Sequence, residues 1–290
     1  MTSMRRRCLA SLAVLIALAA CRPAESPGPV RVPDPQRVIA LAPSLVEMLS
    51  VLDLGDRVVG VGEYCEFPPE ATSRPRIGGL FNPDIEEITR LAPEIAILLP
   101  SEEQLRLQLD RLGVEVLVVP SESLADIEAA AMTLADRFGV SERGEAFVDA
   151  WRESLAPEPL DGSPRVLLAV ARQYGSLAET LSIGPDTFYH ELLERLGAVN
   201  VFADAAGRYP EVNLEEAMQR LPDAIIDVQP EVPHARLRET LKADWNALVG
   251  VPALERDCYA LVAGDHAMLP GPRLPRLYRE LREALEACGY

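Results

Sequence analysis

The sequence has few of the residues that metal sites require. It contains three histidines, His190, His234 and His266, and all of them lie in the second half of its 290 residues. A site for bare zinc or manganese between two halves of a chain would draw histidine and carboxylate ligands from both. We therefore expect no metal site, and no cofactor that belongs to the protein itself.

Motifs of covalent and hydrolytic catalysis are also missing. The sequence has no G-x-S-x-G elbow, no H-E-x-x-H, no phosphate-binding G-x-x-x-x-G-K and no Cys-x-x-Cys. Ser182 lies close to Gly184, but no base stands at a defined spacing, and a loop before a helix at Thr187 accounts for the pair. Without a catalytic constellation, the sequence argues against an enzyme.

The charge balance excludes a further class. The chain has 28 basic and 45 acidic residues, a net charge of -17. A nucleic-acid surface needs clustered Lys and Arg, so we expect no nucleic-acid partner. After the first 20 residues no apolar run reaches the roughly 18 residues that a membrane-spanning helix needs. With 48% hydrophobic residues, the chain can bury a sizeable core.

The N-terminus is typical of a bacterial export signal. Arg5, Arg6 and Arg7 precede the apolar run from Leu9 to Ala20, which ends at Cys21. Leu18-Ala19-Ala20-Cys21 resembles a lipoprotein lipobox and predicts a signal peptide at 1–20 and a lipid anchor on Cys21. An ordinary signal peptide followed by a cysteine is the alternative. The Pro-rich residues 21–36 predict a flexible tether, so we expect a periplasmic or extracytoplasmic protein anchored to a membrane.

Cysteine usage excludes a disulfide scaffold. Beyond the anchor, Cys65, Cys258 and Cys288 remain, and an odd number cannot all pair within one chain. Cys258 and Cys288 are the candidates for one bridge.

Strand and helix patterns alternate along the first half of the chain. Buried-type strands are predicted at 37–42, 58–61, 95–99 and 114–119, with helices from Ser44, at 85–91, at 105–112 and from Ser123. Ser123 with Asp126 forms a variant of the capping box. This alternation predicts a parallel α/β layer.

The second half repeats the same plan. Residues 85–99 align with 214–228 at an offset of 129, which matches Glu86 with Glu215 and Pro93 with Pro222. Arg37-Val38 matches Arg165-Val166 at an offset of 128. Two matches in nearly one register predict two similar α/β lobes with parallel-type central sheets.

Helical patterns at 124–138 and 141–155 lie between the two halves. We interpret Ser141 to Leu155 as a long helix that bridges the lobes and restricts their closure. The predicted organisation is an N-terminal lobe at 37–138, an interlobe helix at 139–158 and a C-terminal lobe at 159–290, with a ligand cleft between the lobes.

Several segments together resemble a known family. They are Arg37 to Ser44, Val59 to Tyr64, Phe67-Pro68-Pro69, Gly78-Gly79 through Pro83 to Glu94, and Gly264-Asp265 to Pro272-Arg273. In order and spacing, these segments resemble the helical-backbone periplasmic binding proteins that serve ABC importers for cobalamin, iron-siderophores and haem, and most of all the cobalamin-binding members. The resemblance covers residues 37 to about 285.

The strand ends indicate which residues form the cleft, because ligands of open parallel sheets lie beyond the carboxyl ends of the strands. The predicted ligand-binding residues of the first lobe are Ser44, Leu45, Tyr64, Cys65, Gly79, Leu80, Phe81 and Ser101. Those of the second lobe are Arg172, Gln173, Tyr174, Gln229, Asp265, His266 and Met268. Aromatic side chains among them suit a broad, flat ligand. For any one aromatic, a packing role is equally compatible.

Glu86 and Glu215 align with the two glutamates that dock each lobe onto the membrane permease in the cobalamin-binding proteins that this chain resembles. Exposed carboxylates suit contacts with permease arginines. The alternative is that they complement the dipole of their helices. Glu87 and Glu216 are duplicated too, so the choice within each pair rests on the resemblance.

The resemblance implies a carrier that captures a corrinoid, with cobalamin as transported ligand, and delivers it as a monomer to an ABC permease and ATPase complex. A ferric siderophore or haem is the alternative cargo, for which Arg172, with Arg76, Arg208 and Arg273 nearby in sequence, would meet anionic groups. An enzyme on the same scaffold is a third interpretation.

Overall fold

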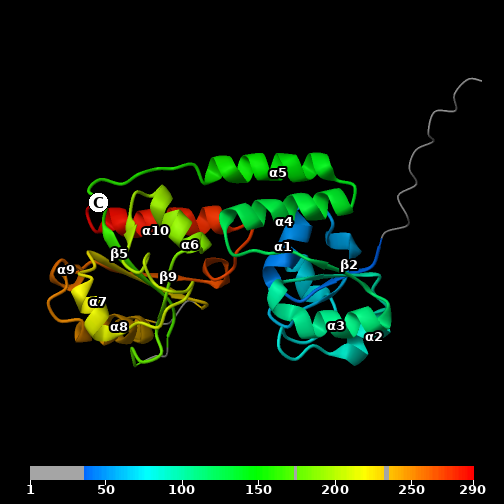
Figure 1. Ribbon diagram of the computed structural model, residues 1–290, viewed down its shortest axis with the longest axis horizontal. Coiled ribbons are helices and arrows are strands. Elements are labelled where there is room, and N and C mark those ends of the chain that lie inside the picture. The colour runs from blue at the N-terminus through cyan, green and yellow to red at the C-terminus, as the bar shows by residue number, and fades with distance from the viewer. Residues whose placement is uncertain (1–35, 173–174, 232–234) are drawn as a thin grey trace, which may run out of the picture. The chain divides into compact units, whose positions relative to one another are not determined.

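The computed structural model describes residues 36–172, 175–231 and 235–290 (Figure 1). The strands are β1 (Val38–Ala40), β2 (Val58–Val61), β3 (Ile95–Leu98), β4 (Glu115–Val118), β5 (Arg165–Ala171), β6 (Leu181–Ser182), β7 (Val199–Asn200), β8 (Ala224–Gln229) and β9 (Tyr259–Ala263). The α-helices are α1 (Pro43–Val51), α2 (Ile85–Leu91), α3 (Glu103–Leu112), α4 (Leu124–Arg137), α5 (Ser141–Ser154), α6 (Phe188–Arg195), α7 (Leu214–Gln219), α8 (Ala235–Asp244), α9 (Pro252–Glu255) and α10 (Leu274–Ala287).

These strands form two separate sheets. The N-terminal lobe has the order β2-β1-β3-β4, with parallel pairing throughout. The C-terminal lobe has the order β6-β5-β8-β9, in which β5, β8 and β9 are parallel and the short β6 is antiparallel. The predicted α/β class with two similar lobes is confirmed.

Alternating residues of each central strand face different cores, because successive side chains of a strand point to opposite faces. In β1, Val38 and Ala40 join the largest core cluster, whereas Ile39 joins a cluster confined to the N-terminal lobe. In β5, Val166 contributes to the largest cluster and Leu167 to a cluster confined to the C-terminal lobe. Each sheet is therefore covered on both faces.

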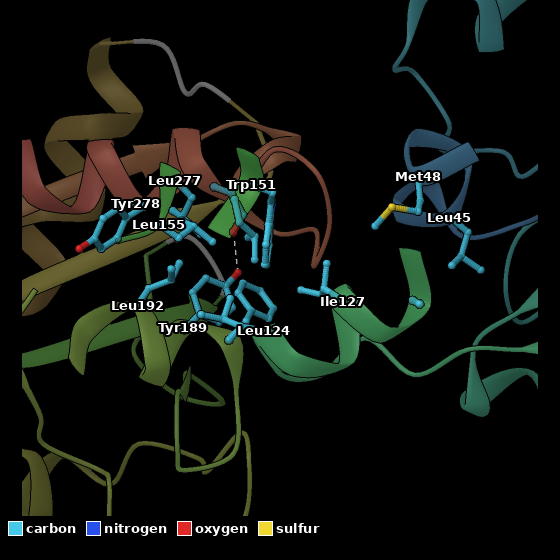
Figure 2. Close-up of a cluster of buried hydrophobic side chains, with 14 of the residues drawn as sticks. Leu45, Met48, Leu124, Ile127, Trp151, Leu155, Tyr189, Leu192, Leu277 and Tyr278 are labelled. Carbon is cyan, nitrogen blue, oxygen red and sulfur yellow. Dashed lines mark hydrogen bonds between the residues drawn. The ribbon is translucent and has the colours of Figure 1, made fainter. Parts of the chain in front are cut away.

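The largest cluster is common to both lobes. Figure 2 shows Leu45 and Met48 of α1, Ile127 of α4, and Tyr189 and Leu192 of α6 among its members. Buried apolar surface stabilises a fold by about 25 cal/mol per Å². A core that runs from one lobe to the other therefore opposes large lobe movements.

Helices α4 and α5 contact both lobes. At the start of α4, the Phe188 amide donates to the Glu122 carbonyl, and at its end Arg137 forms an ion pair with Glu115. In α5, Arg143 pairs with Asp53 of the N-terminal lobe. The pattern at Ser141–Leu155 predicted one bridging helix, and α4 is a further helix with contacts at both ends.

The internal repeat extends to the backbone. Asp84 caps α2 and Asn213 caps α7, and these residues are 129 positions apart. A left-handed residue follows each helix, Ala92 at φ 44° and Leu221 at φ 46°, again 129 positions apart. The short helices α2 and α7 are therefore counterparts.

An arginine holds each counterpart helix against its sheet. Arg37 donates through Nε and Nη2 to the Leu91 carbonyl at the end of α2. Arg165 donates through the same two nitrogens to the Arg220 carbonyl at the end of α7. Cationic side chains stabilise the carbonyl end of a helix. The two helices thus have equivalent positions on their sheets.

A disulfide joins Cys258, before β9, to Cys288, at the end of α10. This settles the pairing that the sequence left open. Cys65 is a free, fully buried thiol, and burial raises its pKa to about 12.

Candidate functional site

A cavity of about 460 Å³ lies at the carboxyl ends of strands from both lobes. Its lining residues come from the loops after β1, β2, β8 and β9 and are Pro43, Tyr64, Glu66, Pro230, Glu231, Asp265, Met268 and Leu269. The position agrees with the rule that ligands of open parallel sheets lie beyond the strands' carboxyl ends. We call this cavity the cleft.

The apolar part of the cleft is adaptable. Tyr64 is 72% exposed, and its ring can cover the face of a flat ligand. Met268 on the opposite wall has a flexible thioether side chain that fits irregular surfaces. Together they offer contact area to a large ligand.

Several predicted binding residues line or border the cleft. Tyr64, Asp265 and Met268 line it. Ser44 is buried directly behind Pro43, and its Cβ lies 3.4 Å from the place that a Cβ on Gly271 would take. The C-terminal lobe therefore approaches the start of α1 closely at this point.

Other predicted residues of the N-terminal lobe do not line the cleft. Phe81 is 96% exposed, Ser101 is also exposed, Gly79 is buried and Leu80 packs against the core. The prediction for Leu45 and Cys65 needs correction: both side chains are buried in the core, and the Cys65 thiol donates to the Leu41 carbonyl. The chain turns Tyr64 outward, so its neighbour Cys65 turns inward.

The prediction for His266 also needs correction. Its side chain is buried, and Nε2 lies 2.7 Å from the Glu280 carboxylate of α10. The next residue, Ala267, accepts a hydrogen bond of 2.6 Å from the Tyr189 hydroxyl. These contacts turn His266 away from the cleft and fix the loop after β9.

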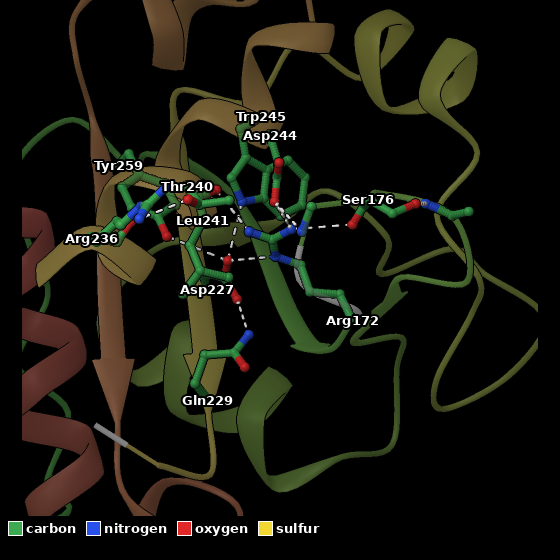
Figure 3. A network of polar contacts seen from close by, with 12 residues as sticks. Arg172, Ser176, Asp227, Gln229, Arg236, Thr240, Leu241, Asp244, Trp245 and Tyr259 are labelled. Atoms are coloured by element: carbon green, nitrogen blue, oxygen red, sulfur yellow. Dashed lines mark hydrogen bonds and ion pairs between the residues drawn. The ribbon is translucent and has the colours of Figure 1, made fainter. Parts of the chain in front are cut away.

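The Arg172 guanidinium is fully buried and is not a cation of the cleft wall (Figure 3). Its Nε donates to Asp227 at 2.7 Å, and its Nη1 donates to Asp244 at 2.9 Å. The Nη2 group donates to the Leu241 carbonyl at 2.7 Å. Arg172 therefore ties the end of β5 to β8 and α8.

Asp227 accepts further hydrogen bonds inside the C-terminal lobe. The indole of Trp245, the hydroxyl of Tyr259 and the amide of Gln229 all donate to its carboxylate (Figure 3). Gln229 is buried and engaged there, so the structure gives it an internal role. Because buried charges require such compensation, the network belongs to the fold of this lobe.

Some predicted residues lie outside the described part of the chain. These are Gln173 and Tyr174, which were predicted for the cleft, and Cys21, which was predicted for the lipid anchor; His234, for which no role was predicted, also lies there. Among the residues that the structure does describe, no group of three or more His, Cys, Asp or Glu side chains is arranged to hold a metal ion.

Sequence reasoning missed Glu66, Glu231 and Leu269 of the cleft. Glu66 and Leu269 are each one residue beyond a predicted wall segment, and Glu231 follows Pro230 after β8. Their position in the sequence could have identified them, because each one follows the carboxyl end of a parallel strand within a few residues.

The cleft carries acidic and no basic side chains among its described lining residues. Nearby arginines are engaged by groups of the protein, and Arg76 and Arg273 pair with the cleft carboxylates Glu66 and Asp265. Arg76 donates to the carbonyls of Gly62 and Cys65, and Arg208 donates to the Asp186 carbonyl. Arg273 pairs with Asp265, and this hydrogen bonding lowers the pKa of Asp265. The arrangement offers little to an anionic ligand.

The duplicated glutamates differ within each pair. Glu87 pairs with Arg90 at 2.5 Å in α2, and Glu216 pairs with Arg220 at 2.6 Å in α7. Hydrogen bonds from Arg90 lower the pKa of Glu87. Glu86 and Glu215 are exposed, and neither carboxylate has an ion pair with any residue of the described ranges. The residues that remain available for an outside partner are Glu86 and Glu215.

None of the helices in the described ranges combines the length and apolarity required to cross a membrane.

Comparisons with known proteins agree with this geometry. A family model described as periplasmic binding protein matches residues 38–254. A vitamin B12-binding protein of Vibrio parahaemolyticus is 25% identical over 257 residues, which cover 87% of this chain and 90% of that protein. A vitamin B12-binding protein of Salmonella typhi is 26% identical over 223 residues, 75% of this chain and 80% of that protein.

Solved structures share the fold. The periplasmic vitamin B12 binding protein of Vibrio cholerae superposes with a TM-score of 0.70 at 22% identity, covering 88% of this chain and 98% of that one. A periplasmic haem binding protein of Pseudomonas aeruginosa gives a TM-score of 0.72 at 25% identity, covering 86% and 92%. These relatives are binding proteins, in agreement with the expectation of a carrier that is not an enzyme and that acts outside the cytoplasm. Since the family model spans most of the sequence, the chain belongs to the periplasmic binding protein family.

Proposed function

We propose that this protein captures a corrinoid, such as cobalamin, in the cleft and delivers it to an ABC importer. The observation that carries the proposal is the cleft itself, which joins Tyr64 and Met268 to three carboxylates and has no basic residue among its described lining. A corrinoid is large, carries little net charge and has amide groups on its rim. Its faces can pack on apolar side chains, and its amide N–H groups can donate to carboxylates. The names of the vitamin B12-binding relatives support the same cargo.

Haem or a ferric siderophore is the second candidate cargo, favoured by the haem-binding protein of the same fold. Such ligands carry carboxylates or catecholates, which call for free arginines at the site. Arg172, Arg76 and Arg273 are engaged in contacts within the protein. The charge of the cleft thus favours the corrinoid.

We further propose that Glu86 and Glu215 dock the two lobes onto arginines of the permease. They occupy equivalent helices and are free of ion pairs with the described residues, while Glu87 and Glu216 are engaged. Carboxylates that are exposed and unpaired can form bidentate contacts with arginine at little desolvation cost.

The proposal includes the N-terminal signal and the organisation of the chain. Residues 1–20 are removed on export, Cys21 carries the lipid, and residues 21–36 tether a monomer to the membrane. The carrier then has lobes at 37–138 and 159–290, linked by the segment at 139–158.

Isothermal titration of residues 22–290 against cyanocobalamin, haem and a ferric siderophore tests the cargo. We expect one-to-one binding of cyanocobalamin with a dissociation constant below about 1 μM, equivalent to about 8 kcal/mol. Binding of haem or siderophore in the absence of cyanocobalamin binding would overturn the corrinoid assignment and support the second candidate.

A further inference from the structure

One guanidinium connects the two walls of the cleft. Arg273, just before α10 in the C-terminal lobe, donates through Nε and Nη2 to the two carboxylate oxygens of Glu47 at 2.9 and 2.5 Å. Glu47 belongs to α1 of the N-terminal lobe, 226 positions earlier in the chain. This bidentate pair is the strong geometry for arginine and carboxylate.

The same guanidinium holds the opposite wall. Its Nη1 and Nη2 groups donate to the two carboxylate oxygens of Asp265 at 3.0 and 2.8 Å. Asp265 lines the cleft. Arg273 therefore forms two bidentate contacts, one with each lobe, and one of its carboxylate partners is a wall of the ligand site.

A third contact comes from the N-terminal lobe. The Arg273 guanidinium carbon lies 4.6 Å from the centre of the Phe67 ring. Phe67 follows Tyr64 and Glu66 in the loop after β2. A cation over an aromatic ring is attracted by the ring's negative face, so this contact ties the loop that carries Tyr64 to the same arginine.

The ion pair between Arg273 and Glu47 is costly to break. The Glu47 side chain is 2% exposed, and burial raises its pKa even in the presence of Arg273. If the lobes moved apart at this point, a buried carboxylate would lose its compensating charge. The loop around Asp265 cannot easily move with the N-terminal lobe, because hydrogen bonds to Tyr189 and Glu280 hold Ala267 and His266 of this loop in the C-terminal lobe.

From this arrangement we propose that Arg273 is an interlobe positioning residue, which sets the separation of the cleft walls in the empty protein through Glu47 and Asp265. The ligand then enters a cleft that already has nearly its bound width. The inference concerns the empty protein and holds for any cargo. Only the expected change in cyanocobalamin affinity rests on the proposed corrinoid ligand.

The test measures the distance between spin labels on Thr89 of α2 and Gln219 of α7, two exposed positions in different lobes. Residues 22–290 are compared with the double variant Glu47→Gln, Arg273→Gln, which removes both charges and leaves no buried carboxylate unpaired. Arg276→Gln is the matched control, because Arg276 lies in the first turn of α10, three residues after Arg273, and pairs with Glu280 within the C-terminal lobe. Cys65 is buried and stays unlabelled.

The wild type and the control are expected to give one narrow distance distribution that cyanocobalamin leaves unchanged. The double variant should give a broader distribution without ligand and a narrow one with it. Its affinity should fall about fivefold or more, in proportion to the fraction of molecules with a competent cleft. Arg273→Lys, which keeps the charge but not the two bidentate contacts, should lie between the two.

A double variant that is folded by circular dichroism and has the wild-type distance distribution would overturn the inference. Should the double variant not fold, the distribution of Arg273→Lys decides: broadening supports the positioning role, and a wild-type distribution contradicts it. If the wild type binds no cyanocobalamin, the proposed cargo is wrong, while the distances in the empty protein still decide the role of Arg273.

Discussion

Glu86 and Glu215 are each the second residue of a short helix, α2 and α7. Each helix has a capping side chain at the corresponding position, a left-handed residue after its end and an arginine that donates to a carbonyl at its end. Their neighbours, Glu87 and Glu216, are engaged in ion pairs along the helices. Of the two neighbouring glutamates in each helix, one is therefore engaged in an ion pair and the other has none with the described residues.

This relationship predicts a transport defect without a binding defect. We expect Glu86→Ala with Glu215→Ala to lower uptake of labelled cyanocobalamin about tenfold or more, since each lost charge-assisted contact is worth about 1.5–3 kcal/mol. Ligand affinity should stay within about twofold. Glu87→Ala with Glu216→Ala is the matched control and should transport nearly normally. Loss of ligand affinity in the Glu86 and Glu215 variant would show that these residues serve the cleft instead.

The buried network of Arg172 predicts a stability effect. Arg172→Ala leaves Asp227 buried without its ion-pair partner, which should lower the free energy of unfolding by about 3–5 kcal/mol. At a temperature where the variant is folded, cyanocobalamin affinity should change little, because Arg172 is not in the cleft wall. Urea unfolding and titration measure the two quantities. A stable variant with lost affinity would restore Arg172 to the ligand site.

The disulfide predicts a second stability effect. Cys258 and Cys288 enclose a sequence separation of 30 residues, and closing a loop of this size stabilises a fold by about 3–4 kcal/mol. Cys258→Ser with Cys288→Ser should therefore shift the urea midpoint downward, while a Cys65→Ala variant keeps the bridge. An unchanged midpoint in the double variant would mean that the bridge does not constrain the unfolded chain.

Glu102 predicts that stability falls as the pH rises. Burial raises the pKa of Glu102 to about 7, against an ordinary value of 4.5. Because the folded protein holds this proton more tightly than the unfolded chain, the free energy of unfolding should decline from about pH 4.5 to pH 7. Glu102→Gln, which is neutral at every pH, should remove this part of the slope and be more stable than wild type by about 3 kcal/mol at pH 8. If the free energy of unfolding of the variant and of the wild type changed equally with pH, Glu102 would not be the group responsible.

The sequence was informative where structure is local. Ser123 with Asp126 caps its helix as expected, because a cap depends on residues within one turn, and the helix predicted at Thr187 is present as α6. The repeat also followed from sequence, since both copies keep the same residue types. No element was predicted at β9 or α10, which lie before and after the loop at Asp265.

The direction of side chains at the strand ends could not be predicted. Arg172 turns inward because Asp227 and Asp244, 55 and 72 positions away, compensate its charge. The buried His266 turns toward Glu280, whose carboxylate lies 2.7 Å from its Nε2. Such partners come together only in the folded chain, so strand-end position alone identified the right loops and not always the right residues.

Hydrogen–deuterium exchange of residues 22–290 with and without cyanocobalamin tests the central claim most directly. We expect slower exchange in the cleft loops, at 62–66, 230–231 and 264–269. Protection confined to the separate N-terminal cavity around Asp53, Glu70 and Arg74, or no protection at saturating ligand, would contradict it.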